Sequence, residues 1–224
     1  MTHPAALRSS PWDSAVLGVQ AYEITDPSRE MLAEAARVPG HYTVRWNPLE
    51  SKQPLHDYGF YYCDTLIEPY CVAKDFSAYD DVAVTISEQI SLDALLDICH
   101  GAFGYGRFHR DFSVSRRNAD MRYDNWLAQL YAEGMVYGLL YAGELVGFIA
   151  VQRNRLVLHA IAQSHRGRGF AKSLWSPVCR AVFDRGYDEL VSSVSAANLA
   201  AVNLYASLGF RFRNPVDLYH RLTR

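Results

Sequence analysis

The sequence predicts an α/β fold. Its second half alternates apolar, strand-like runs with amphipathic helical stretches. A basic turn with two glycines, R-G-R-G at residues 166–169, separates one of these strands from the helix behind it. A shorter pattern of strands and helices precedes them. We therefore expect a small α/β domain over residues 1–76 and a larger one over residues 82–224.

The composition limits the kind of protein. With 224 residues, 50% of them hydrophobic, the chain can bury a core without disulfides or metals. A net charge of −2 argues against binding to nucleic acid or to an anionic membrane surface, which need a basic face. The sequence has no apolar run near the roughly 18 residues of a membrane span and no signal peptide, so we expect a cytoplasmic protein. Its four cysteines are not spaced like zinc ligands, and we expect no metal.

The first domain is expected to follow a short arm at residues 1–11. Its elements are a turn anchored by Trp12 and Leu17, a strand at Val19–Ile24, a helix at 28–37, a strand at Tyr42–Trp46, a short helix within Pro48–Tyr58, and a strand at Phe60–Ile67. The Y-G-F string at residues 58–60 resembles L-G-F at residues 208–210. This similarity indicates a partial internal duplication, although a Gly-Phe pair after a helix also arises by chance.

The second domain follows a boundary at residues 75–81, which are rich in Asp and Tyr. Its expected elements are a strand at Val82–Ile86, a helix from the cap Ser91 to Ala102, a helix at Asn118–Glu133, a hairpin of Val136–Tyr141 and Leu145–Val151, a strand at Leu156–Ala162, a helix from Phe170 to a stop at Gly186, a strand at Glu189–Ser195, a helix at Asn198–Leu208, and a last strand. The loop at residues 103–116 is basic and aromatic.

The turn at residues 166–169 has the properties of an anion site. Gly167 and Gly169 allow positive φ and a close approach of the backbone to a ligand. The unpaired N–H groups at the start of the following helix, near Phe170, favour a phosphate or pyrophosphate. Arg166 and Arg168 add positive charge. The alternative is an exposed turn with two solvated arginines.

Two sequence strings resemble motifs of the GNAT acetyltransferases. Q-S-H-R-G-R-G-F-A fits the family's Q/R-x-x-G-x-G/A acetyl-CoA motif, with Arg166, Gly169 and Ala171 at the defining positions. N-L-A-A-V-N-L-Y-A-S-L-G-F fits the later N-x-x-A-x-x-L-Y-x-x-x-G-F signature. The resemblance implies a mixed sheet splayed at its centre, with acetyl-CoA between the parting strands. It also implies direct acetyl transfer to an amine in a ternary complex.

The resemblance assigns roles to several residues of the second domain. The tyrosine that matches Tyr205 protonates the departing CoA thiolate, which needs a nearby acid, and the asparagine that matches Asn198 helps to hold the pantetheine arm. The two residues are seven positions apart, or about two helical turns, so we expect them on one helix face. Ile161 and Ala162 would offer backbone groups to the pantetheine amides and to the thioester oxygen. The alternative for Tyr205 is a core aromatic.

The general base is harder to predict. Many GNAT enzymes have a glutamate on the strand before the acetyl-CoA turn, but the run at residues 155–161 contains none. His159 is the titratable residue in this run with a suitable affinity for a proton. A structural histidine, with deprotonation through a chain of waters, is the alternative.

The acceptor is suggested by outer motifs. W-D-S-x-x-L-G-V at residues 12–19, A-F-x-x-x-R-F at 102–108 and Y-x-x-W at 123–126 resemble the bacterial dTDP-fucosamine acetyltransferases, which acetylate the 4-amino group of a dTDP-linked dideoxy sugar for a surface polysaccharide. The resemblance implies that Arg107, Asp111 and Tyr123 bind a nucleotide-linked amino sugar, because arginines among aromatic residues can hold a diphosphate and a base. A solvated loop would have the same composition.

Other functions share the core motifs. An acetyltransferase for another small amine, an antibiotic or a protein N-terminus would differ in its acceptor loops. A non-catalytic acyl-CoA sensor would keep the acetyl-CoA turn without needing Tyr205. The edge of a GNAT sheet often pairs with a second copy, which is compatible with a homodimer but is not required by this sequence.

Overall fold

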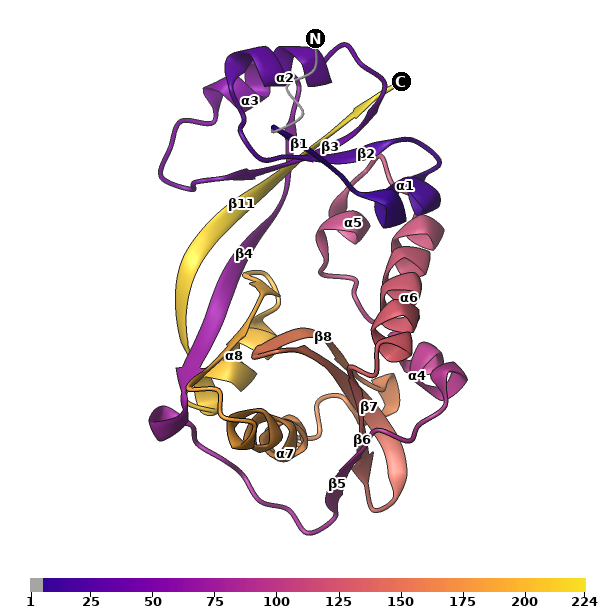
Figure 1. Cartoon of the computed structure of the whole chain (residues 1–224), viewed down its shortest axis with the longest axis vertical. Helices are drawn as coiled ribbons and strands as arrows, with labels where there is room; N and C mark the ends of the chain where they lie inside the picture. Colours follow the sequence, from indigo (N-terminus) through magenta and orange to yellow (C-terminus); the bar gives the residue numbers. More distant parts are fainter. Residues whose placement is uncertain (1–5) are drawn as a thin grey trace. The chain divides into compact units, whose positions relative to one another are not determined.

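The computed structural model describes residues 6–224, which form two compact units (Figure 1). Unit 1 contains the chain up to Leu66 together with Tyr105–Arg122 and Pro215–Arg224. Unit 2 contains Ile67–Gly104 and Tyr123–Asn214. The chain passes between the units four times, whereas the sequence predicts a single boundary at residues 75–81. The difference arises because residues 105–122 and 215–224 pack with the N-terminal segment.

Unit 1 is a mixed sheet with short helices. Its strands lie in the order β1-β2-β3-β11-β4, of which β4 and β11 continue into unit 2. The elements are β1 (Leu7–Ser9), α1 (Pro11–Leu17), β2 (Ala21–Ile24), α2 (Arg29–Ala35), β3 (Gly40–Trp46), α3 (Gln53–Asp57), β4 (Tyr61–Val72), α5 (Arg107–Arg110), the first part of α6 (Arg116–Ala132) and β11 (Arg211–Thr223). Tyr42, Val44 and Tyr219 join a hydrophobic cluster with Leu32 and Leu55 on one face of this sheet.

The segment at residues 11–17 is a helix and not the predicted turn. Pro11 occupies its first turn, where a proline costs no hydrogen bond, and Gly18 ends it in the left-handed conformation with φ 69°. The helix buries Asp13 and Val16, while the predicted anchor Trp12 is 54% exposed. Sequence inspection missed this helix because a seven-residue segment shows barely two turns of periodicity.

Unit 2 confirms the predicted α/β class. Its strands lie in the order β11-β4-β9-β8-β7-β6-β5, and β10 pairs with β4. The remaining elements are the 3₁₀ turn η1 (Ala73–Asp75), β5 (Val84–Ser87), α4 (Leu92–Cys99), the rest of α6, β6 (Val136–Tyr141), β7 (Glu144–Gln152), β8 (Arg155–Ile161), the 3₁₀ turn η2 (Gln163–His165), α7 (Ala171–Asp184), β9 (Glu189–Ser192), β10 (Val194–Ser195) and α8 (Leu199–Ser207). None of the helices within residues 6–224 combines the length and apolarity needed to cross a membrane.

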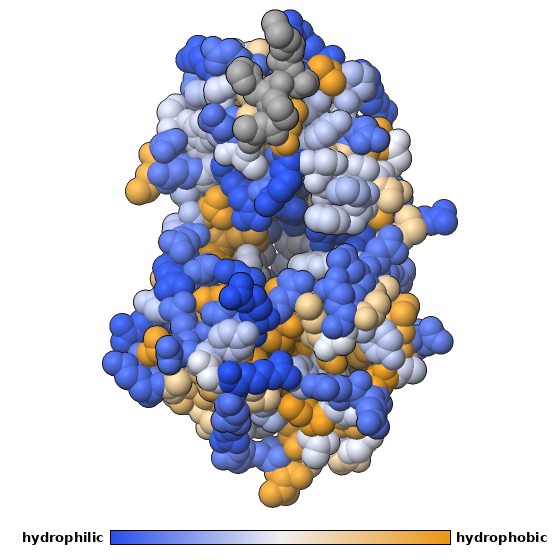
Figure 2. Space-filling model, viewed as in Figure 1, coloured by the Kyte–Doolittle hydropathy of each residue, from blue (hydrophilic) through white to orange (hydrophobic). Residues whose placement is uncertain are grey.

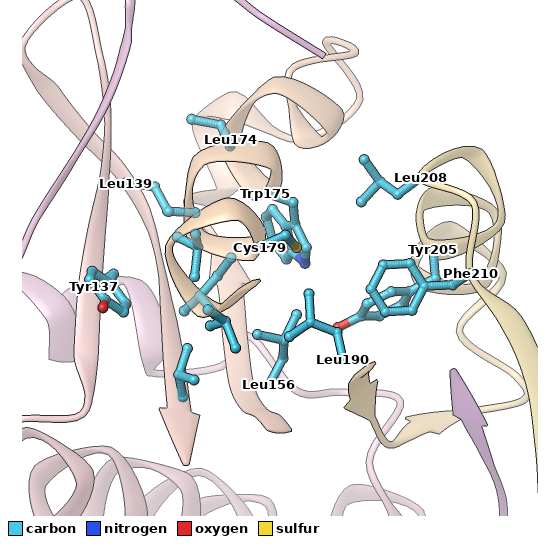
Figure 3. Packing of buried hydrophobic residues seen from close by; sticks show 14 of the residues in the cluster. Tyr137, Leu139, Leu156, Leu174, Trp175, Cys179, Leu190, Tyr205, Leu208 and Phe210 are labelled. Atoms are coloured by element: carbon cyan, nitrogen blue, oxygen red, sulfur yellow. The ribbon is translucent and has the colours of Figure 1, made fainter. Parts of the chain in front are cut away.

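The sheet of unit 2 is covered on both faces. Along β7, Ile149 and Val151 belong to the cluster under α7 and α8, whereas Phe148 and Ala150 belong to the cluster under α4 and α6. Successive side chains of a strand point to opposite faces, so this alternation assigns one core to each side. Figure 3 shows the first cluster, in which side chains from the sheet meet Trp175 and Cys179 of α7 and Tyr205 of α8. On the surface view of Figure 2, hydrophilic residues predominate, with separate hydrophobic areas between them.

Each unit repeats one strand arrangement. In unit 1, β2 and β3 are parallel and β3 is antiparallel to β11. In unit 2, β8 and β9 are parallel and β9 is antiparallel to β4. The helix exits also match, because the N–H of Phe60 donates to Leu55 O at 2.9 Å and that of Phe210 donates to Tyr205 O at 3.0 Å. These features support the predicted internal duplication, with Leu55 in the place of Tyr205.

Gly209 should not tolerate a side chain. Gly209 and Gly186 share a φ of 87°, so alanine costs about 1–2 kcal/mol of conformational strain at either position. A Cβ at Gly209 would lie only 2.1 Å from the carbonyl oxygen of Asp75, whereas one at Gly186 meets nothing within 4 Å. We expect Gly209→Ala to lower the free energy of unfolding by clearly more than Gly186→Ala does, as measured by urea denaturation. Equal losses would contradict the contact.

Candidate active site

The parallel strands β8 and β9 part after a short stretch of pairing. Their register contains Arg155↔Val191 and Leu156↔Ser192, while β8 continues to pair with β7 as far as Ile161. The N–H of Ala162 donates to Val146 O at 2.8 Å. Because hydrogen bonding alternates along an antiparallel pair, the backbone groups of Ile161 and His159 point away from β7, toward the side where β9 has departed.

The turn after β8 has the predicted backbone. Gly167 and Gly169 have φ values of 73° and 82°, and a Cβ on either would meet nothing within 4 Å. Helix α7 begins at Ala171, and Phe170 at its N-cap position forms no side-chain cap. The first N–H groups of α7 therefore lack a side-chain cap, and Arg166 and Arg168 lie exposed in the turn. The ring of Phe170 stacks on Tyr141 with the centroids 4.4 Å apart.

Two of the predicted backbone contacts are occupied within the protein. Arg166 Nε donates to the carbonyl oxygen of Ile161 at 2.8 Å, and the Ala162 N–H is used by Val146. Of the backbone groups predicted at Ile161 and Ala162, the N–H of Ile161 is therefore the one that faces the parted strands. Arg166 ties the turn to the end of β8.

A hydrogen-bonded chain lies where the strands part. The Tyr205 hydroxyl is 2.8 Å from Nε2 of His159 and 3.0 Å from Oγ of Ser192. Ser192 Oγ in turn donates to Leu156 O at 2.8 Å. Tyr205 is fully buried, and the edge of the His159 ring lies against Trp175, with the centroids 5.2 Å apart. The two residues predicted for catalysis are thus in direct contact.

The pKa shifts within this hydrogen-bonded chain favour a proton donor over a general base. Burial lowers the pKa of His159 to about 4, so the ring is neutral at pH 7. Burial raises the pKa of Tyr205, and the hydrogen bond with Ser192 opposes part of that rise. A phenol that stays protonated can donate a proton to a leaving group. A group with a pKa near 4 is poorly matched to an amine at neutral pH, and a role for His159 as the base stays a prediction.

Asn198 has a structural task at the start of α8. Its side-chain oxygen accepts from the Ala201 N–H at 3.2 Å, and its φ and ψ of −85° and 72° are not helical. The expected common helix face with Tyr205 is therefore wrong, because Asn198 precedes the helix as its N-cap. Its role toward pantetheine stays a prediction.

Asp111 is buried and does not form the exposed acceptor contact that its loop suggested. Its Oδ2 accepts from His220 Nδ1 at 2.7 Å and lies 3.1 Å from His41 Nε2, while its Oδ1 accepts from the Tyr61 hydroxyl at 2.9 Å. The N–H and Oγ of Ser113 also donate to Oδ1. Burial alone would raise the pKa of Asp111, but the hydrogen bonds from His220 and His41 outweigh it and hold that pKa far below its usual range.

His41, Asp111 and His220 also have a composition suitable for binding a metal. Both ring nitrogens, however, lie at hydrogen-bonding distance from the same carboxylate oxygen, which fits two N–H donors. We therefore treat the cluster as a hydrogen-bond network inside unit 1. The substrate-binding role predicted for Asp111 is corrected accordingly.

The other predicted acceptor residues lie in separate units. Arg107 belongs to unit 1, where its guanidinium lies 4.8 Å from the centroid of the Phe108 ring. Tyr123 belongs to unit 2, where it stacks on Phe103 at 4.5 Å and joins the core beneath α4 and α6. Their roles in substrate binding stay predictions.

Ser192 and Trp175 were missed by sequence reasoning. Ser192 is one of three serines in the strand at residues 189–195, and no local pattern distinguishes it from Ser193 or Ser195. Its partners Leu156 and Tyr205 are 36 and 13 positions away. Trp175 has the helical spacing of an ordinary core residue.

Acid should destabilise the protein through His159 and His220. Burial lowers the pKa of both His159 and His220 to about 4, below the ordinary value of 6.5. The unfolded chain therefore binds more protons between these values, and stability should fall as the pH drops from 6.5 to 4, by up to about 1.4 kcal/mol per pH unit for each histidine. Thermal unfolding as a function of pH measures the slope. His220→Gln should flatten it, while replacement of the exposed His56 should not.

Comparisons with known proteins agree with this geometry. Residues 103–210 match the model of the acetyltransferase (GNAT) family. A GCN5-related N-acetyltransferase from Sphaerobacter thermophilus has the same fold, with a TM-score of 0.64, 13% identity, and coverage of 96% of this chain and 75% of that one. A tandem GNAT protein from the clavulanic acid biosynthesis pathway has a TM-score of 0.54 and 10% identity, with coverage of 92% and 76%.

A curated relative is similar over a shorter stretch. N-acetyltransferase 8F1 of Mus musculus is 34% identical over 79 residues, which are 31% of this chain and 36% of that protein. The chain thus matches about a third of the length of this relative. The parted strands, the glycine turn and these similarities together indicate a GNAT-type α/β fold. Residues 103–210 thus match the GNAT acetyltransferase family, and the fold of the chain is similar to that of GNAT proteins.

Proposed function

We propose that the protein is an acetyl-CoA-dependent N-acetyltransferase that acts by direct transfer in a ternary complex. The observation that carries the proposal is the hydroxyl of Tyr205 at the point where β8 and β9 part, in the same unit as the glycine turn that opens α7. A thioester bound along the parted strands would have its sulfur near an uncharged acid. Holding two reactants together in this way supplies about 7–11 kcal/mol toward the barrier.

The chain's own residues account for each step of this reaction. The N–H groups at residues 167–171 would bind the CoA diphosphate, assisted by Arg168. The backbone N–H of Ile161 would polarise the thioester carbonyl. The neutral amine attacks the carbonyl carbon, the C–S bond breaks with its electron pair going to sulfur, and Tyr205 protonates that sulfur. The attacking nitrogen loses one proton, and this proton restores the Tyr205 hydroxyl. Pantetheine would enter beside the end of β8, where Arg166 Nε already donates to Ile161 O.

Unit 1 does not repeat the acetyl-CoA turn in the residues that the structure describes. The corresponding connection between β2 and α2 contains Asp26 and ends at Ser28, whose side chain accepts from the Met31 N–H at 3.3 Å. A capped helix start beside a carboxylate is unsuited to a phosphate. We therefore propose one acetyl-CoA per chain.

The acceptor that we propose is the amino group of a nucleotide-linked (dTDP) deoxy sugar. The support is the outer sequence motifs and the arginine and aromatic residues between 103 and 112, of which Phe112 is 81% exposed. The burial of Asp111 removes one of the residues first assigned to this contact. Other small amines, antibiotics and protein N-termini are the alternatives. Release of free thiol with each class of acceptor, measured side by side, distinguishes them.

Acetyl-CoA binding should depend on the glycine turn. Gly169→Asp places a carboxylate where the diphosphate is expected, and we expect at least about tenfold weaker binding in calorimetry, because like charges repel and the backbone can no longer approach. Gly143→Asp is the matched control, since Gly143 has a similar φ of 83° and equally open surroundings in the β6–β7 turn. Unchanged binding by the Gly169 variant would place the cofactor elsewhere.

A further inference from the structure

Tyr205 stands in the middle of a chain of three polar contacts, all inside unit 2. Its hydroxyl lies 2.8 Å from His159 Nε2 and 3.0 Å from Ser192 Oγ, and Ser192 Oγ lies 2.8 Å from the carbonyl oxygen of Leu156. Ser192 and Tyr205 are completely buried. Each contact therefore needs a proton between its two atoms, because a buried pair of facing lone pairs is costly.

Counting protons leaves one arrangement that satisfies all three contacts. The carbonyl oxygen of Leu156 can only accept, so the single proton of the Ser192 hydroxyl is used there. Ser192 can then only accept from Tyr205, which uses the single phenolic proton. The remaining contact needs a proton on Nε2 of His159, which donates to the phenolic oxygen.

We propose that Ser192 is a positioning residue that sets the direction of this chain. It holds Tyr205 as a donor toward Ser192 and as an acceptor from His159, and it thereby selects the Nε2–H tautomer of the histidine. The position suits the task, since Leu156↔Ser192 is the last pair in the register of β8 with β9. The side chain of Ser192 thus bonds to the strand that its own backbone leaves.

The direction of the chain matters for the reaction, and this step rests on the proposed function. When the C–S bond breaks, the Tyr205 proton leaves its hydrogen bond to Ser192 Oγ and moves to sulfur, and the phenolate left behind keeps the hydrogen bond from His159 Nε2–H. A hydrogen bond to the charged form stabilises that form, so it assists proton donation. The proton later lost by the acetylated nitrogen restores Tyr205.

Without Ser192 the direction of the hydrogen bond between Tyr205 and His159 can reverse. Tyr205 would then donate its proton to an Nε2 that carries none, with the other proton of the neutral ring on Nδ1. The phenolic proton would then lie in a hydrogen bond to the histidine, and the phenolate would lose the donor that His159 Nε2–H otherwise provides. Ser192 therefore acts on the reaction through the two residues next to it.

Nitrogen NMR of protein carrying ¹⁵N-histidine tests the tautomer directly, without acetyl-CoA or an acceptor. At neutral pH, we expect His159, assigned by its loss in His159→Gln, to be the Nε2–H tautomer in the wild type. Ser192→Ala should shift it to Nδ1–H, whereas Ser193→Ala, a change at the exposed neighbour, should leave it unchanged. An Nδ1–H tautomer in the wild type, or no change in Ser192→Ala, overturns the proposal.

Kinetics provide a second readout. We expect Ser192→Ala to lower kcat about tenfold with little change in the KM for acetyl-CoA, as the loss of one buried hydrogen bond implies. Combined with Tyr205→Phe it should cause no further loss, because the serine acts through that hydroxyl. An additive loss would contradict this. If the wild type transfers no acetyl group, the proposed function fails, while the NMR result still decides the role of Ser192.

Discussion

Replacing Tyr205 with phenylalanine is expected to lower kcat by about 100-fold or more, because general acids contribute at least that factor. The KM for acetyl-CoA should change little, since the hydroxyl acts when charge develops on sulfur. The ring itself packs against Phe210 with the centroids 4.9 Å apart, and phenylalanine keeps that contact (Figure 3). Initial rates of thiol release at saturating acetyl-CoA measure the effect.

Tyr187→Phe is the matched control. Tyr187 packs against the same hydrophobic cluster, so its variant reports on packing alone. Calorimetry on Tyr205→Phe should show unchanged uptake of acetyl-CoA. A variant that binds and also turns over at the wild-type rate would rule out Tyr205 as the acid. If the wild type binds acetyl-CoA but acetylates none of the three acceptor classes, the sensor alternative becomes the better explanation.

Asp111→Asn should cause the largest loss of stability among the variants considered. The carboxylate accepts from His220, His41, Tyr61 and Ser113 inside unit 1, and an amide cannot accept from all of these donors. Breaking a buried charged network by changing one partner costs about 3–5 kcal/mol. Chemical denaturation at pH 7 measures the change in the free energy of unfolding.

Asp80→Asn is the control for Asp111→Asn, because it removes the charge of a carboxylate that forms a salt bridge at the surface. Asp80 pairs with Arg180 at the surface, where the exchange should have little effect. A variant of Asp111 that is as stable as the wild type would argue against the network and would return Asp111 to the acceptor site. A destabilised variant that still binds the acceptor normally would support the structural role.

The duplicated arrangement explains how one chain holds a single proposed site. Both units contain a parallel strand pair bridged by a helix, and in both a strand from another part of the chain lies beside the second strand of the pair. Unit 1 has Leu55 where unit 2 has Tyr205, and its helix α2 is capped by Ser28. We infer that the first copy keeps the framework, while the second carries the proposed chemistry.

Local features were predictable because their causes lie close together in the sequence. The positive φ values of Gly167 and Gly169, the start of α7 and the hairpin of β6 and β7 follow from glycine placement, helical spacing and alternation. The helix at residues 11–17 was missed for the opposite reason, since a proline and a glycine framing two turns resemble a loop. The prediction of an α/β fold needed only these local patterns, whereas the mixed sheet was implied by the GNAT resemblance, and both are confirmed.

Only the tertiary structure decided which polar residues meet. Asp111 lies in a charged, aromatic loop that has the composition of an exposed surface, yet its partners His41 and His220 are 70 and 109 positions away. Tyr205 and His159 were each identified from the sequence, but their contact and the serine that completes the chain depend on how β8 and β9 part. The sequence by itself determined most of the helices and strands and the conformation of the glycine turn, because backbone conformation is a local property. Burial and hydrogen-bond partners are set by packing between distant segments, and these decided the roles of Asp111 and Ser192.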